Sequence, residues 1–67
     1  MNITDEQKRL LFFYAPETKD SLTTNDIDDL LDKLDDKITE IGFDKNWELN
    51  DIGIKLQLLY DQIYSQN

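Results

Sequence analysis

The sequence predicts an all-α fold, a small three-helix bundle in which residues 1–67 form a single helical domain. Apolar residues recur every three or four positions in two long stretches, which is the spacing of a helix with one buried face. A residue able to cap a helix stands before each of three predicted segments. The 67 residues include no cysteine and no histidine, so helix packing has to stabilise the chain without disulfides or a Cys/His zinc site.

The first helix is expected over residues 4–14. Thr4 is a suitable N-cap with Gln7 three positions later, the spacing of a capping box. The helix should stop before Pro16, because the residue that precedes a proline disfavours helical geometry. Its apolar residues gather near its end, and Phe12 is the one expected at the surface. The expected core members are Leu10, Leu11, Phe13 and Tyr14.

The second helix, over residues 23–41, shows the clearest pattern and follows a polar loop over residues 15–22. Thr23 is expected as its N-cap, with Asp26 at the third helical position in a variant of the capping box. Gly42 is expected to end the helix in the left-handed conformation. The predicted buried stripe consists of Ile27, Leu30, Leu31, Leu34, Ile38 and Ile41.

The third helix is expected over residues 50–64, with Asn50 as its N-cap. Residues 46–49 allow a very short extended segment before it, because apolar and polar side chains alternate there. Gly53 falls in the first turn of the helix, where a glycine destabilises less than in the middle. The predicted buried side consists of Ile52, Leu56, Leu59, Tyr60 and Ile63.

Acidic residues dominate the charge, since 15 Asp and Glu against 7 Lys and Arg give a net charge of −8. Such a chain repels nucleic acid and anionic membranes at neutral pH and attracts basic proteins. No signal peptide is recognisable, and no stretch approaches the roughly 20 apolar residues of a membrane-spanning helix. We therefore expect a cytoplasmic protein without direct contact to nucleic acid or membrane. The abundance of Asn, Lys, Ile and Asp is typical of AT-rich bacterial or phage genomes.

Six acidic residues of the second helix fall opposite its apolar stripe, and we call them the aspartate stripe. Several of these residues form like-charge pairs four positions apart, and each such pair destabilises a helix by about 0.2–0.5 kcal/mol. Short carboxylates lose few rotamers on binding, so this arrangement is suited to the arginine and lysine side chains of a basic protein. The alternative is a solvated face that only maintains solubility. The aspartate stripe consists of Asp28, Asp29, Asp32, Asp35, Asp36 and Glu40.

Two aromatic residues lie off the predicted buried faces. Tyr64 and Phe12 are candidates for apolar anchors beside the stripe, because exposed aromatic residues are frequent hot spots of protein interfaces. The alternative for each is partial burial against a neighbouring turn. Together with the aspartate stripe, these two residues make up the predicted partner-binding site.

Catalytic and metal-binding residues are not expected. Without histidine or cysteine, a nucleophile–base pair would have to combine Ser or Thr with Lys or a carboxylate, and the only serines are Ser21 and Ser65. A bundle of this size also has little room for a water-excluding pocket. Leu49 and Lys55 occupy the positions at which an EF-hand calcium loop needs a glycine and a bidentate glutamate. Four alternating polar residues nevertheless resemble the start of such a loop: Asp44, Asn46, Glu48 and Asn50. We expect no enzyme, no cofactor and no bound metal.

The segment WELNDIGIKLQLLYDQIY, residues 47–64, resembles the strand-to-final-helix segment of winged-helix regulators. The resemblance implies a β-hairpin around residues 43–50 and a degenerate winged-helix domain. Asn50 stands where the family has threonine, and no basic recognition helix precedes the segment, so DNA binding is not implied. The residues that carry the resemblance are Trp47, Leu49, Gly53, Leu56 and Leu59.

These observations favour a small acidic, non-enzymatic protein-interaction module that binds a basic protein surface. The concrete hypothesis is an inhibitor of the immunity-protein, antitoxin, phage or mobile-element type, which occupies the basic groove of a nucleic-acid-binding enzyme and imitates nucleic acid. The alternative is a structural or regulatory homo-oligomer, a homodimer included. Leu58 discriminates between them, because it lies off the main stripe and is buried only if something packs there.

Overall fold

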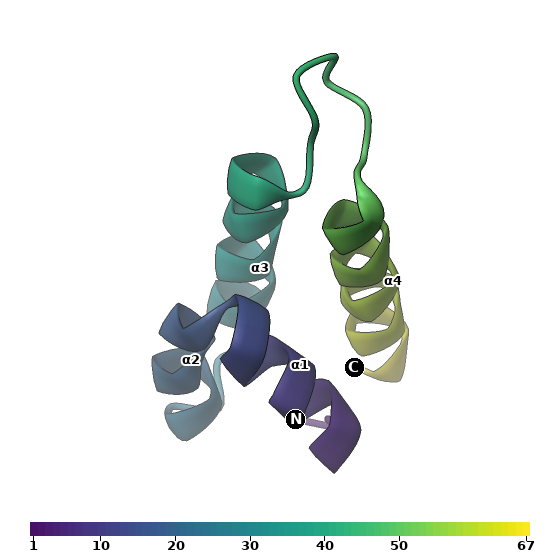
Figure 1. The fold of residues 1–67 in the computed structure, drawn as a ribbon. Helices are drawn as coiled ribbons and strands as arrows, with labels where there is room; N and C mark the ends of the chain where they lie inside the picture. Colours follow the sequence, from purple (N-terminus) through teal and green to yellow (C-terminus); the bar gives the residue numbers. More distant parts are fainter.

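The computed structural model describes residues 1–67 and confirms the all-α prediction (Figure 1). α3 and α4 lie side by side, and a protruding loop joins them at one end (Figure 1). α1 lies across the other end of this pair. None of the helices has both the length and the apolar character needed to cross a membrane. The elements are α1 (Asp5–Tyr14), the 3-10 turn η1 (Pro16–Thr18), α2 (Lys19–Thr23), α3 (Ile27–Ile41) and α4 (Asp51–Gln66).

α1 begins with the predicted capping box. Thr4 Oγ1 accepts a hydrogen bond from the backbone N–H of Gln7 at 3.1 Å, and the backbone N–H of Thr4 donates to Gln7 Oε1 at 3.0 Å. Gln7 is itself buried and donates from Nε2 to Oε1 of Gln66 at 2.9 Å and of Gln62 at 3.2 Å. These amide contacts hold α1 against the C-terminal end of α4. The sequence did not predict this contact between the two helices.

The polar loop predicted over residues 15–22 is wrong, because η1 and α2 occupy most of it. Pro16 opens η1, a position that suits its fixed backbone angle and missing N–H. The buried side chains of this segment are small, namely those of Ala15, Thr18 and Ser21. Thr18 Oγ1 donates a hydrogen bond to the carbonyl oxygen of Ala15 at 2.7 Å. A face built from small and hydroxylated residues gives no apolar periodicity, so the usual helical pattern is missing.

α3 begins later than predicted. Its N-cap is Asp26, whose carboxylate accepts from the backbone N–H of Asp29 at 3.1 Å. Thr23, the predicted N-cap, is instead the last residue of α2 and donates to the carbonyl oxygen of Lys19 at 3.0 Å. Asn25 has a φ of 56° and separates the two helices, since a residue in the left-handed region cannot continue an α-helix.

The core lies between α3, α4 and one side of α1. The predicted stripes of α3 and α4 are confirmed as buried or partly buried. Phe13, predicted to be core, is 78% exposed, because α1 crosses its neighbours and turns only a narrow face inward. Leu10 and Tyr14 are partly buried. The fully buried apolar side chains of the core are Leu11, Leu30, Leu34, Ile38, Leu56, Leu59 and Ile63.

Gly42 does not adopt the predicted left-handed conformation, since its φ is −88°. Its role is close approach: a Cβ built on Gly42 would lie 2.9 Å from the Cα of Gly53. A Cβ on Gly53 would overlap the carbonyl oxygen of Gly42. That carbonyl accepts from the backbone N–H of Asn50 at 2.8 Å, and Asn50 caps α4 as predicted. The two glycines therefore bring the end of α3 and the start of α4 into backbone contact.

The loop between α3 and α4 contains a single β-bridge, between Phe43 and Leu49. The extended segment allowed at 46–49 is thus limited to Leu49, and the paired strands of the implied winged-helix hairpin are absent. Asp44 Oδ1 accepts from the backbone N–H groups of Asn46 and Glu48, which closes the turn. These bonds close residues 44–48 as a turn rather than as a pair of strands.

Candidate functional site

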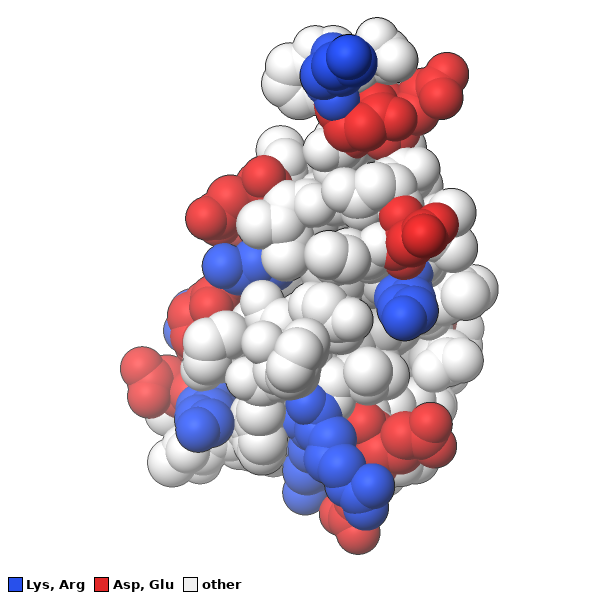
Figure 2. Space-filling view, in the orientation of Figure 1, with Lys and Arg blue, Asp and Glu red and all other residues white.

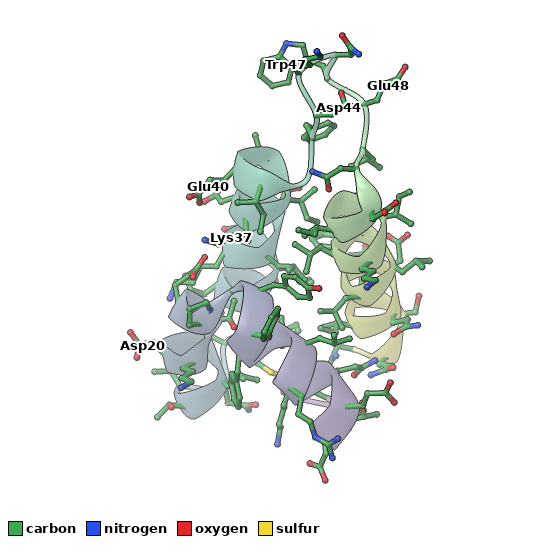
Figure 3. The ribbon with its side chains drawn as sticks, viewed as in Figure 1. Asp20, Lys37, Glu40, Asp44, Trp47 and Glu48 are labelled. Carbon is green, nitrogen blue, oxygen red and sulfur yellow. The ribbon has the colours of Figure 1, made fainter.

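The aspartate stripe lies on the outer surface of α3. Five of its six members are exposed, and Asp29 is half-buried. Figure 2 shows acidic and basic residues mixed along the left edge of the molecule, where Glu40 of α3 and Asp20 of α2 lie (Figure 3). The members without an ion pair to any basic residue are Asp28, Asp32, Asp35 and Asp36.

The other two members of the stripe are neutralised within the chain. Asp29 pairs with Lys33 at 2.9 Å. Glu40 pairs with Lys37 at 3.3 Å, and Figure 3 shows both residues on the same side of α3. Lys37 also pairs with Glu17 of η1 at 3.1 Å. Both lysines of α3 are therefore engaged on the side that faces η1 and α2. Asp29 and Glu40, two of the residues predicted to bind a partner, each have a basic partner within the chain.

Asp29 instead fastens α2 to α3. The buried Ser21 donates from Oγ to Asp29 Oδ2 at 2.6 Å. This hydrogen bond, followed by the bond from Lys33, holds the pKa of Asp29 below its usual range. The bond to Asp29 correspondingly raises the pKa of Lys33. The carboxylate is thus favoured in its charged form by partners that belong to the fold.

Acid should loosen this contact. Because the pKa of Asp29 is lowered in the folded state, its stabilising contribution is present above the ordinary aspartate pKa and is lost as the pH falls through the lowered value. Ser21→Ala removes the largest cause, so the pKa of Asp29 should rise toward the ordinary value. NMR titration of the Asp29 carboxyl carbon in both proteins measures this, with Ser65→Ala as control. An unchanged pKa in Ser21→Ala would contradict the assigned role.

Tyr64 of α4 lies close to Asp28, the first residue of the aspartate stripe. Its side chain is 67% exposed, and its ring lies 6.4 Å from that of Tyr60 at an interplanar angle of 9°. Tyr64 and Asp28 line the same open pocket between α3 and α4, which has a volume of about 330 Å³. Ile27 and Leu31 supply its apolar lining. The structure thus brings one predicted anchor together with one predicted charge.

Phe12, the other predicted anchor, has a different setting. It is 39% exposed, and Lys19 Nζ lies 5.1 Å from the centre of its ring, within the range of a cation–π contact. Phe12 lines neither of the two pockets of the molecule. The contact with Lys19 ties α1 to α2, and nothing brings Phe12 to the free aspartates.

The sequence did not reveal the exposure of Trp47. This residue lies at the tip of the loop between α3 and α4 and is 78% exposed (Figure 3). Its φ of 61° is rare for a bulky residue. The alternation of residues 46–49 predicted only a short extended segment, whereas residues 44–48 form a turn closed by Asp44, and Trp47 is exposed at its tip. No pattern of residue types predicts a left-handed tryptophan.

A second open pocket, of about 560 Å³, lies between α1 and α4. Leu10, Leu58 and Leu59 form its apolar part, and Glu6 and Lys55 contribute charges of both signs. Leu58 is 57% exposed, so no part of the chain covers this residue. The sequence did not predict this pocket and indicated only that Leu58 lies off the main stripe.

The acidic side chains of the molecule do not form a group of three or more that could hold a metal ion. A comparison with models of protein families, with curated proteins and with solved structures finds no significant match to this chain.

Proposed function

We propose that this protein is a small non-enzymatic binding module that attaches to a basic surface of another protein through α3. The observation that carries this proposal is the set of exposed carboxylates without an ion pair: Asp28, Asp32, Asp35 and Asp36. The lysines of α3 are held on the opposite edge by Asp29, Glu17 and Glu40, so they do not neutralise this set.

The free carboxylates are held at fixed positions by the helix that carries them. Leu30, Leu34 and Ile38 anchor α3 in the core. The carboxylates of Asp28, Asp32 and Asp36 follow one another at intervals of four residues, about 6 Å along the helix axis. Neighbouring like charges at this spacing repel each other, and a cationic partner relieves the repulsion. The binding energy is therefore electrostatic, and the affinity should fall steeply with salt.

Inhibition is the role that such a surface serves best. A groove that binds nucleic acid is lined with arginine and lysine, and a rigid row of carboxylates competes for the same side chains. The net charge of −8 adds long-range attraction that accelerates the encounter. We place the protein among inhibitors of the immunity-protein, antitoxin, phage or mobile-element type.

The test uses an oligoarginine peptide as probe, with affinity measured by calorimetry at several salt concentrations. The variant Asp32→Asn/Asp35→Asn/Asp36→Asn should lose about tenfold or more in affinity at low salt. Its thermal stability should rise, because like-charge pairs on α3 disappear.

The matched control removes three charges elsewhere and changes the net charge equally: Glu6→Gln/Glu48→Gln/Asp61→Asn. These residues are exposed and form no ion pair. The control should keep most of the affinity. Equal losses in both variants would show that net charge alone attracts the peptide and would overturn the assignment to α3.

The second candidate function is a homo-oligomer, and the exposure of Leu58 favours it. Leu58 and Ile54, one turn apart on α4, are 57% and 49% exposed. Figure 2 shows uncharged residues across the middle of the face that carries α1, with charges toward its edges. Two copies could meet there without opposing their acidic α3 surfaces. Sedimentation velocity at micromolar concentration distinguishes a monomer from this assembly.

A further inference from the structure

We propose that the pocket between α3 and α4 binds the side chain of a single arginine presented by the basic partner. This inference rests on the proposed function and names one side chain through which the basic partner would bind. The pocket has a volume of about 330 Å³ and is lined by Ile27, Asp28, Leu31, Tyr64 and Asn67. It combines an aromatic ring, a carboxylate and an aliphatic surface.

The ring of Tyr64 provides a flat surface for a planar cation. The ring is nearly parallel to that of Tyr60, at 9° and 6.4 Å, and remains 67% exposed. Guanidinium groups stack on aromatic rings and are attracted by the negative potential of the ring face. The neighbouring Tyr60 limits the orientations open to Tyr64, which lowers the entropy lost on binding.

Asp28 provides the counter-charge. It is exposed and has no basic partner in the chain. The carboxylate of Asp26 already caps the positive end of α3, so Asp28 is not needed for that purpose. Asp32 follows one turn later and adds negative potential. A carboxylate accepts two parallel hydrogen bonds from a guanidinium group, an arrangement that a lysine ammonium cannot make.

Ile27 and Leu31 form the apolar lining against which the methylene groups of an arginine can pack. Asn67 closes one side, and its amide is already engaged. Its Nδ2 donates to the carbonyl oxygens of Asn2 at 3.1 Å and Ile63 at 2.8 Å, and its Oδ1 accepts from the backbone N–H of Asn2 at 2.8 Å. Asn67 therefore acts as a fixed wall.

Other ligand classes fit this pocket less well. An anion would be repelled by Asp28 and by the three other free aspartates of α3. An uncharged apolar group would bury the Asp28 carboxylate without a partner, which is costly. A lysine would satisfy the charge but would lose the planar stacking and the paired hydrogen bonds. The combination of ring, carboxylate and apolar lining therefore favours arginine.

The test titrates the isotope-labelled protein with N-acetyl-arginine amide and separately with N-acetyl-lysine amide, followed by two-dimensional NMR. The arginine compound should cause saturable shifts at the five pocket residues and bind more tightly than the lysine compound. Tyr64→Leu and Asp28→Asn should each weaken arginine binding about fivefold. Asp61→Asn removes one charge from α4 outside the pocket and should leave binding unchanged.

Equal shifts with both compounds, spread over all acidic residues, would overturn the proposal, as would unchanged binding in Tyr64→Leu. The outcome is separable from that of the proposed function. A pocket that binds the arginine compound, with an oligoarginine affinity insensitive to Asp32→Asn/Asp35→Asn/Asp36→Asn, would reject the α3 surface and retain the pocket. Loss of oligoarginine binding in that variant, without pocket shifts in the native protein, would do the reverse.

Discussion

Gly53→Ala should lower the free energy of unfolding by about 2–3 kcal/mol, because the added methyl group overpacks a backbone contact. A Cβ at this position would overlap the carbonyl oxygen of Gly42 and lie 2.9 Å from Leu49 Cδ2. Intrinsic helix propensity predicts the opposite sign, since alanine is favoured over glycine in a helix by about 1 kcal/mol. The sign of the measured change therefore decides whether the contact between the two glycines is present.

The measurement is urea denaturation followed by circular dichroism, with Ser65→Ala as control. Ser65 lies on the same helix and is exposed, so its substitution should change the stability by less than about 0.5 kcal/mol. If Gly53→Ala proved more stable than the native protein, the close approach of α3 and α4 would be wrong.

Leu34→Ala should lower the free energy of unfolding by about 3 kcal/mol. Leu34 is fully buried on α3 and belongs to the core that α3, α4 and α1 share. A domain of this size has a total stability of about 3–10 kcal/mol, so the variant should be close to unfolding. Its melting temperature and its helical signal at room temperature would both fall.

Leu58→Ala is the matched control, because it makes the same chemical change at an exposed position. In a monomer it should cost less than about 0.5 kcal/mol. A larger loss that grows with protein concentration, accompanied by faster sedimentation of the native protein, would favour the homo-oligomer. Equal losses for Leu34→Ala and Leu58→Ala at every concentration would contradict the burial described for α3.

Helices with a strong local pattern were predictable from the sequence. The apolar spacing from Ile27 to Ile41 defines α3, because a helix in water needs one continuous face to bury. Thr4 and Gln7 define the start of α1, since a capping box is formed by residues three positions apart. The position of the aspartates on the outer face of α3 follows from the same period.

The candidate site was predictable only in part. The exposure of Tyr64 was expected, and it follows from its position outside the buried face of α4. Phe12 and Asp29 were expected to face a partner. The structure places Lys19 Nζ over the ring of Phe12, which stays exposed, and joins Asp29 to Ser21 and Lys33. Those contacts depend on α2. The sequence did not predict this helix, because its buried residue, Ser21, is small and polar and gives no apolar periodicity.

The sequence by itself determined the helical class, the stripes of α3 and α4 and the excess of negative charge, because each depends on residue types at short separations. The tertiary structure decided which carboxylates remain free, where Gly42 meets Gly53, and that Tyr64 and Asp28 share one pocket. Each of these depends on how two helices are placed relative to one another. That placement is set by packing among residues distant in the chain, which no local pattern encodes.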